Sequence, residues 1–84
     1  MKHISNSLRK YRRVRGLKQK EVAEILGLQS ASIISRWEKG QSMPNTINAF
    51  KLALIYRTMV DALFIDLSRA LKEDLHRKEE AIRK

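Results

Sequence analysis

The chain has 84 residues, which is enough for one small domain and too few for two. It contains no cysteine, so a disulfide framework and a thiolate metal site are both excluded, as suits a reducing cytosol. Its two histidines, His3 and His76, are too far apart in sequence to predict a metal cluster, and we expect both at the surface. The start of the chain shows no apolar leader, and no run approaches the roughly 18 apolar residues of a membrane helix, so we expect a soluble protein inside the cell.

The net charge of +9 belongs entirely to the first part of the chain. Residues 1–60 hold 12 Lys and Arg against 3 Glu, whereas residues 61–84 hold 6 basic and 6 acidic side chains. Such a concentration of positive charge is what a phosphate-binding surface needs, because each neutralised phosphate releases condensed counterions. A basic face that only keeps the protein soluble is the alternative.

A first helix is predicted to begin after Ser5 or Ser7, either of which can cap it, and to end near Arg15. Its apolar residues recur at helical spacing, so one face is expected to point inward and the other to carry positive charge. The inward face is expected to hold Leu8, Tyr11 and Val14, and the outward face Arg9, Lys10, Arg13 and Arg15.

A second helix is predicted for Lys18–Gly27, where Val22, Ile25 and Leu26 recur at helical spacing and Gly27 then ends the helix. The stretch that follows, QSASIISRWEKG at residues 29–40, predicts a third and short helix. Ser30 is a suitable N-cap and Gly40 a suitable end. Its two faces are expected to differ, with Ile34 and Trp37 on a packing face and Ser32, Ser35, Arg36 and Lys39 projecting elsewhere.

Two short helices joined by a tight glycine-containing turn form a helix-turn-helix. The run GLKQKEVAEILGLQSASIISRWEKGQSMPN resembles the Cro and phage-repressor-like (XRE) helix-turn-helix family, over roughly Asn6 to Phe64. The matching features are Gln19 at the start of the second helix, the EVAEILG and ISRWEKG blocks, and Pro44 after the third helix. The resemblance implies an all-α, five-helix, lambda-repressor-like domain that binds double-stranded DNA.

The resemblance also implies that the third helix is the recognition helix in the major groove. Arg36 is the best base-reading candidate, because a guanidinium can bond guanine O6 and N7 together; a phosphate contact without specificity is the alternative. Between Gly27 and Ile34 the chain has one residue more than the common family pattern, so either the turn is longer or the helix begins earlier. The other candidates are Ser32 and Ser35 for base edges or phosphates, Ala31 or Ile33 for a thymine methyl group, and Gln29 for adenine if it lies at the helix start.

Phosphate contacts are a second implication of the resemblance. Gln19 matches a family glutamine that hydrogen-bonds a phosphate near a helix N-terminus, where the helix dipole favours anions; an ordinary exposed helix residue is the alternative. Arg12 and Glu38 match a family ion pair that ties the first helix to the third, against the alternative of a solvated surface arginine. The remaining expected phosphate contacts are Lys18, Ser30, Lys39, Gln41, Ser42 and Asn45.

Pro44 places residues 41–45 in a loop, and Asn45 can cap a fourth helix at about Thr46–Tyr56. Thr58 and Asp61 resemble a capping box that starts a fifth helix, which nothing local stops before Lys84. The fourth helix is expected to bury Ile47, Phe50 and Leu54, with Ala53 filling small gaps.

The fifth helix carries an apolar stripe that continues past the usual end of the family domain, so we expect a DNA-binding domain at 6–65 and a helical extension at 66–84. An isolated helix cannot bury its own face, so the extension either folds back on its own domain or pairs with a second chain. Pairing is favoured, because the core is small and proteins of this type bind two half-sites as dimers. Lys78 lies on the stripe and weakens its last turns. The stripe consists of Val60, Leu63, Phe64, Leu67, Leu71, Leu75 and Ile82, and the candidate dimer interface of Leu67, Leu71 and Leu75.

No residue spacing in the chain predicts an active site or a cofactor site, since there is no glycine-rich phosphate loop and Ser35 and His3 suggest no triad. The sequence therefore predicts a DNA-binding transcriptional regulator rather than an enzyme, with repression favoured and an inverted repeat bound by a homodimer. We expect the protein to be encoded by a prokaryote or a phage and to lie in the cytoplasm, associated with the nucleoid. The alternative is an antitoxin or adaptor whose C-terminal helix binds another protein; RNA binding is disfavoured because no aromatic stacking platform is visible.

Overall fold

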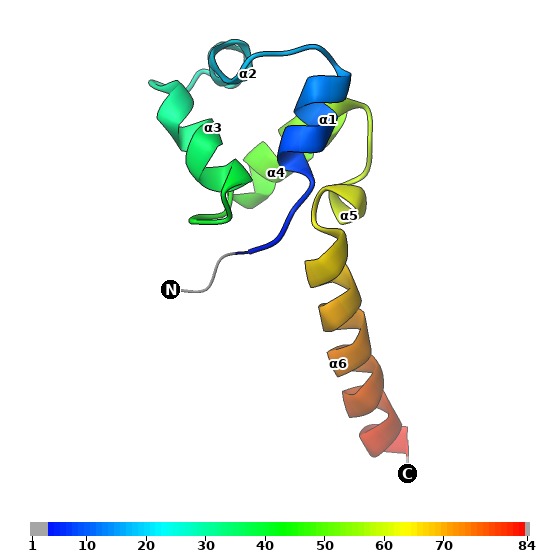
Figure 1. Ribbon diagram of the computed structural model, residues 1–84. Coiled ribbons are helices and arrows are strands. Elements are labelled where there is room, and N and C mark those ends of the chain that lie inside the picture. The colour runs from blue at the N-terminus through cyan, green and yellow to red at the C-terminus, as the bar shows by residue number, and fades with distance from the viewer. Residues whose placement is uncertain (1–3, 84) are drawn as a thin grey trace.

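A computed structural model describes residues 4–83, so the surface position expected for His3 and the end expected at Lys84 fall outside the described residues. Within that range the chain is all-helical, as predicted (Figure 1). The predicted five helices become six, because the fifth divides. The helices are α1 (Leu8–Val14), α2 (Gln19–Leu26), α3 (Ala31–Glu38), α4 (Thr46–Tyr56), α5 (Val60–Leu63) and α6 (Ile65–Arg83).

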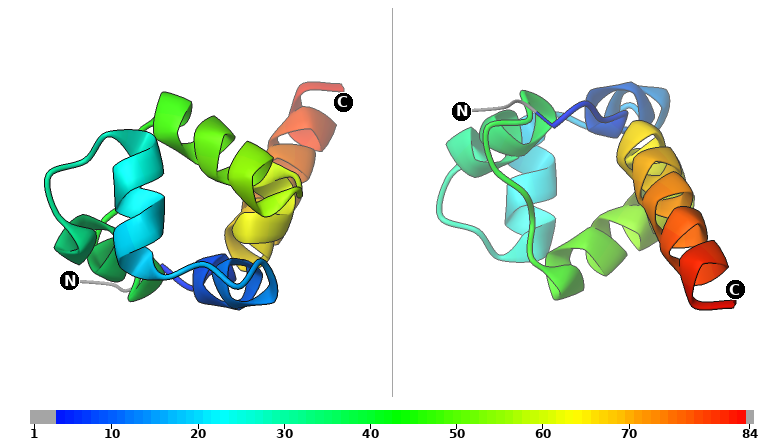
Figure 2. Two further views of the ribbon diagram at one scale, coloured as in Figure 1. Left: turned by 90° about the horizontal axis from the view of Figure 1, so that it is seen from above. Right: turned by 90° about the horizontal axis from the view of Figure 1, so that it is seen from below.

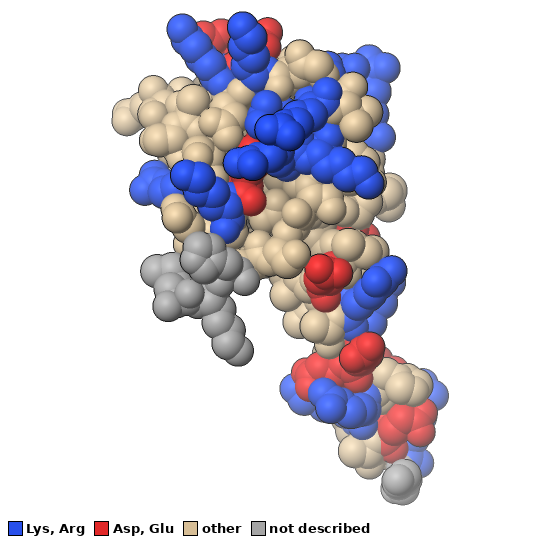
Figure 3. Space-filling model, viewed as in Figure 1, with Lys and Arg blue, Asp and Glu red and all other residues tan. Residues whose placement is uncertain are grey.

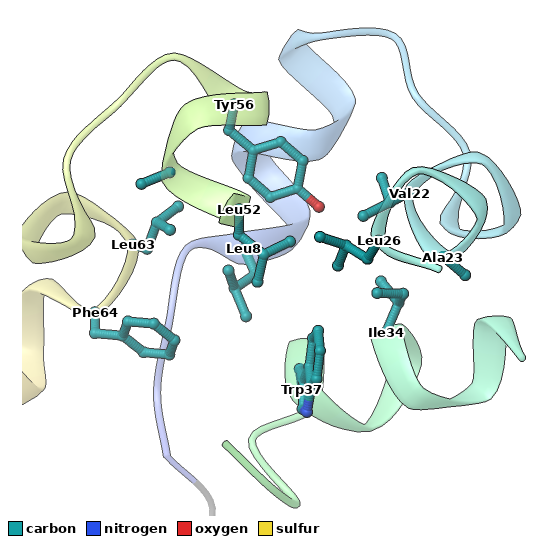
Figure 4. Packing of buried hydrophobic residues seen from close by; sticks show 11 residues of the cluster. Leu8, Val22, Ala23, Leu26, Ile34, Trp37, Leu52, Tyr56, Leu63 and Phe64 are labelled. Carbon is teal, nitrogen blue, oxygen red and sulfur yellow. The ribbon is translucent and has the colours of Figure 1, made fainter. Parts of the chain in front are cut away.

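The first five helices enclose one hydrophobic core, whereas α6 leads away from it toward the C-terminus (Figures 1 and 2). Figure 4 shows side chains from each of the five helices converging on this core. Ile34 and Trp37 of α3 are buried there, as their three-residue spacing predicted. The core consists of Leu8, Val22, Ala23, Leu26, Ile34, Trp37, Leu52, Ala53, Tyr56, Leu63 and Phe64.

Several apolar residues predicted to face inward are instead exposed, and the prediction for them was wrong. The α4 sequence TINAFKLALIY is apolar on nearly every side, so its periodicity does not choose which face packs. In the structure α4 buries Leu52, Ala53 and Tyr56. In α2, Ala23 takes the buried place beside Val22 and Leu26. The residues concerned are Val14 in the last turn of α1 and Ile47, Phe50 and Leu54 in α4. Ile25, which shares the helical spacing of Val22 and Leu26, is exposed as well.

The predicted capping box of Thr58 and Asp61 was also wrong. Met59 is the N-cap of α5, and no side chain caps that helix. The helix then stops after one turn because Phe64 adopts a non-helical backbone (φ −129°, ψ 52°). This conformation places the Phe64 side chain among the buried residues and redirects the chain into α6.

Hydrogen bonds at the start of α1 also differ from the prediction. Ser7 occupies the N-cap position, but its side chain makes no capping hydrogen bond, and Ser5 instead donates to Asp66 at the start of α6 (3.1 Å). The Oδ1 atom of Asn6 accepts from the backbone N–H of Leu8 (3.1 Å), as short polar side chains before a helix often do. The N-terminal segment is therefore attached to α6 as well as to α1.

Candidate nucleic-acid interface

The candidate recognition helix α3 begins and ends where its sequence predicts. The Oγ atom of Ser30 accepts a hydrogen bond from the backbone N–H of Ser32 (3.0 Å), which satisfies one of the free N–H groups of the first turn. At the other end Gly40 takes a left-handed backbone (φ 74°). The connection from α2, residues 27–30, has four residues, which is within the usual length of a helix-turn-helix turn.

The two faces of α3 have different surroundings. Ile34 and Trp37 are buried in the core, while Ser32 and Arg36 are exposed on the opposite side. Among the other base-reading candidates, Gln29 in the preceding turn is exposed. Ala31, Ile33 and Ser35 are half-buried, and Ile33 packs against the core, which leaves it less free to contact a base.

The C-terminal end of α3 is attached to the N-terminal segment of the chain. Asn6 Nδ2 donates to the carbonyl oxygen of Trp37 (2.9 Å), and the backbone N–H of Ile4 donates to the carbonyl oxygen of Gly40 (3.0 Å). A Cβ atom at Gly40 would collide with the backbone of Ile4, so only glycine permits this approach. Asn6 was not predicted as a site residue, although an asparagine just before a helix is a known signal for backbone bonding.

The predicted ion pair is present and joins α3 to α1. Arg12 Nε lies 2.6 Å from Glu38 Oε2, and Arg12 Nη2 donates to Glu38 Oε1 (3.1 Å). The side chain of Glu38 is 0% exposed and that of Arg12 11% exposed, so water screens this pair poorly. Arg12 Nη1 also donates to the carbonyl oxygen of Leu17 (2.9 Å), and Arg9 Nε lies 3.4 Å from Glu38 Oε1. The alternative of a solvated Arg12 is therefore excluded.

The pKa values of the pair reflect this geometry. Burial alone would raise the pKa of Glu38, but hydrogen bonds from Arg12 and Gln19 and the positive charge of Arg12 outweigh burial and lower it. The hydrogen bond to Glu38 correspondingly raises the pKa of Arg12. Nearby in the core, burial and the Glu38 charge raise the pKa of Tyr56, whose buried hydroxyl has no hydrogen-bond partner within the described part of the chain. Glu38 therefore stays ionised at neutral pH.

Gln19 belongs to the same network. Its Nε2 atom donates to Glu38 Oε1 (3.0 Å), and its side chain is half-buried, so it is not the ordinary exposed helix residue of the alternative interpretation. An amide nitrogen carries two hydrogens, so one remains for a phosphate at the N-terminus of α2. Three elements, α1, α2 and α3, therefore meet at Glu38.

The remaining phosphate candidates are exposed around the ends of α2, α3 and α4. Ser30 is partly engaged, because its hydroxyl lies 2.8 Å from that of Ser32. The Oδ1 atom of Asn45 accepts from the backbone N–H of Asn48 (2.8 Å), as predicted for the cap of α4, which leaves the amide nitrogen of Asn45 for a phosphate. The exposed candidates are Lys18, Ser30, Lys39, Gln41, Ser42 and Asn45.

Charge is distributed unevenly over the molecule (Figure 3). On the face shown, Lys and Arg gather over the helical domain, while α6 shows both signs interspersed. Lys10 and Arg13 of α1 are exposed and were not assigned to the DNA contact, although the charge count of residues 1–60 already pointed to them. Within residues 4–83, no cluster of potential metal ligands is present, and none of the helices could cross a membrane.

The candidate dimer residues lie along α6, which has no buried residue. Leu67 is half-buried and packs against the core, whereas Leu71 and Leu75 are exposed. The structure therefore does not show the alternative in which the extension folds back on its own domain (Figure 2).

Comparison with known proteins agrees with this geometry. The helix-turn-helix family matches residues 8–63, which comprise α1 to α5 and all the candidate DNA contacts. No curated protein and no solved structure matches the chain. The matched family consists of DNA-binding regulators rather than enzymes. The chain belongs to the Cro and phage-repressor-like (XRE) helix-turn-helix family of DNA-binding transcription regulators.

Proposed function

We propose that the chain is a sequence-specific repressor that binds an inverted repeat in double-stranded DNA as a homodimer. Residues 6–65 form its DNA-binding domain and residues 66–84 its dimerisation helix. The observation that carries the proposal is the division of α3, which buries Ile34 and Trp37 and exposes Ser32 and Arg36. A helix held by its packed face, with polar groups on the other, can present those groups to base edges.

The anchoring of α3 supports specificity, because a base-reading side chain discriminates only if its backbone is held in place. Glu38 receives hydrogen bonds from α1 and α2, and the backbone of Trp37 and Gly40 receives them from the N-terminal segment. Exposed cations surround the helix and supply the sequence-independent part of the affinity. Repression requires no further activity, since a protein bound at an operator blocks other proteins from the same DNA.

Base contacts and phosphate contacts fall to different residues of the interface. Arg36 reads guanine, and Ser32 and Ser35 contact base edges or phosphates, with Gln29, Ala31 and Ile33 at the margin of the base contact. Phosphate contacts position the protein, whereas base contacts carry the sequence preference. The phosphate contacts are Lys18, Gln19, Ser30, Lys39, Gln41, Ser42 and Asn45.

A selection of bound fragments from random duplex DNA, at stated salt, tests the proposal. Arg36→Ala is expected to weaken binding by about 1–3 kcal/mol and to relax the preference at one base pair. Lys39→Ala, the matched control, is expected to weaken all sequences alike. A uniform loss with Arg36→Ala would show that Arg36 only contacts phosphate. The selected sites are expected to contain two half-sites centred roughly 34 Å apart, and a single asymmetric half-site would contradict the homodimer.

The exposed stripe of α6 also favours a second candidate function, an antitoxin or adaptor whose C-terminal helix binds a different protein. Light scattering on the purified chain separates the two. A stable homodimer supports the first proposal, and an aggregation-prone monomer supports the second.

A further inference from the structure

Helices α4 and α6 together leave a large apolar surface uncovered. Phe50 is 60% exposed in the middle of α4, and Ile47 and Leu54 lie on the same face, one turn to either side. On α6, Leu71 and Leu75 are exposed, and Ile82 is 83% exposed. A groove of about 400 Å³ lies between the two helices. Its apolar lining includes Met43, Phe50, Phe64, Leu67, Leu71 and Leu75.

The charges around this surface favour a second copy of the same chain as its occupant. Among the described residues, only Asp61 and Lys72 contribute charge to the lining of the groove. Helix α6 itself carries five acidic and five basic residues, so its net charge is zero. Two copies of the basic domain repel each other, but two copies of α6 do not. A stable interface needs roughly 800 Å² from each partner, more than three leucines of α6 supply, and the α4 face enlarges it.

We propose that the two α6 helices of the homodimer pair in antiparallel orientation about Leu75. Ile82 of the partner subunit then enters the groove beside Phe50, and the reciprocal contact forms on the other side. This interface rests on the homodimer proposed above and specifies how its two copies meet. Ile82, the most exposed large apolar residue among residues 4–83, then lies in the groove that the partner subunit leaves open.

One register of antiparallel helices satisfies the charges on both flanks of the stripe. Centred between residues 75 and 76, it sets Lys72 opposite Glu79 of the partner subunit on one flank. On the other flank it sets Asp74 opposite Arg77 of the partner subunit. Within one copy, Asp74 Oδ1 lies 3.3 Å from Arg77 Nη2, and Asp74 Oδ2 lies 2.9 Å from Lys78 Nζ. These exposed pairs contribute little to stability, so exchanging them for contacts with the partner costs little.

The same register also matches residue sizes. It brings the small Ala70 against Ala81 of the partner subunit, and it brings Leu67 close to Ile82 of the partner subunit. Lys78 lies beside the partner's Leu71, where its aliphatic stem can pack while its ammonium group reaches solvent. The stripe is therefore continuous across the pair despite its one cation.

Helix direction follows from the location of the positive charge. In a parallel pair the two basic domains would lie at the same end and repel each other. In the antiparallel pair the two copies of Leu67 are about 25 Å apart along the helices, at roughly 1.5 Å per residue, and the domains lie at opposite ends. The antiparallel arrangement therefore minimises repulsion while covering both grooves.

Because the chain has no cysteine, single cysteine substitutions test the geometry directly. A disulfide requires Cα atoms within about 7 Å, which the antiparallel pair provides at its centre and not at its ends. Leu75→Cys is therefore expected to convert most of the protein to a covalent dimer on mild oxidation. Ile82→Cys alone is expected to remain monomeric on a denaturing gel, as is the control Ile25→Cys, whose residue is exposed on α2.

A mixture of the Phe50→Cys and Ile82→Cys proteins, treated with a short bismaleimide, is expected to give a dimer band that neither protein gives alone. All the substituted residues are exposed, so the variants are expected to fold. Far-UV circular dichroism checks that they keep their helical content. Self-crosslinking of Ile82→Cys would show a parallel pair and overturn the inference, as would a Leu75→Cys protein that dimerises but forms no disulfide. Either result leaves the homodimer intact, whereas a monomer in light scattering overturns both.

Discussion

Helices α1 to α5 and helix α6 solve the burial of apolar side chains in different ways. The first five helices cover one another, and nearly every core residue is within a few per cent of complete burial. Helix α6 is the longest helix of the chain and has no buried residue. Helices α1 to α5 are short and are stabilised by packing against one another. Helix α6 is longer, but only its N-terminal end packs against the rest of the chain.

The two regions also differ in how they use charge. In the domain, an ion pair is removed from water and joined to three helices, so each member depends on the others. On α6, the ion pairs link residues three or four apart on one exposed surface. The difference fits a rigid DNA-binding surface on the domain and the association through α6 that we propose above.

The largest effect is expected from breaking the buried ion pair. Arg12→Leu removes the closest cation from the buried carboxylate of Glu38 and leaves only the Gln19 hydrogen bond (3.0 Å) and the longer Arg9 contact (3.4 Å). This should lower the free energy of unfolding by about 3–5 kcal/mol. Arg77→Leu is the matched control, because the Arg77 side chain is 76% exposed and pairs with Asp74 within one helix. It should change the free energy by less than about 0.5 kcal/mol.

Urea denaturation at a concentration where the chain is monomeric measures both variants. Equal losses in the two variants would remove the distinction between buried and exposed pairs in this protein. A large loss with Arg12→Leu alone would show that the domain depends on a contact that α6 lacks.

A second comparison lies within α4, where Leu52 is 1% exposed and Leu54, two residues later, is 78% exposed. Leu52→Ala creates a cavity in the core and should cost about 2–5 kcal/mol of unfolding free energy. Leu54→Ala should cost less than about 0.5 kcal/mol in the monomer. Thermal or urea denaturation of the dilute monomer checks this. A similar cost at both positions would mean that the exposed face of α4 is packed in the free chain.

The same helix shows why part of the fold was not predictable from sequence. The burial of Ile34 and Trp37 was predicted from their three-residue spacing, because the serines and charged residues of α3 mark the opposite face. In α4, apolar residues occupy overlapping faces, and local spacing does not reveal which face the neighbouring helices cover. The prediction chose the face of Phe50, and the core took the face of Leu52.

The candidate site was predictable to a similar degree. The ends of α3 and the pair of Arg12 and Glu38 follow from local capping and from a family pattern. The part of Asn6 in holding α3 was not predicted, because it depends on a contact across 31 positions in the sequence. The break at Phe64 was likewise missed, since no glycine or proline marks it and only the core explains it.

A smaller effect is expected from pH. Glu38 has a pKa below its ordinary value of 4.5 in the folded chain, so near that value the unfolded chain binds more protons and stability rises with pH. The contribution is complete above pH 4.5 and is lost as the pH falls through the folded pKa. Glu38→Gln should cost about 1–3 kcal/mol at about pH 7 and flatten this slope. Unfolding measured from about pH 3 to 7 checks it, and a Glu38→Gln protein that kept the wild-type slope would contradict it.

The smallest effect concerns salt, and it tests whether the two regions divide the work of DNA binding. Each phosphate contact adds about 0.9 to the slope of log affinity against log salt concentration. Lys18→Ala, at the start of α2, should lower that slope by about 1, because one counterion fewer is released. Lys72→Ala on α6 should leave the slope unchanged at concentrations where both variants are dimers. An equal reduction of the salt slope in both variants would show that α6 contacts the DNA backbone. The neutral charge of α6 would then not be explained by association between two copies.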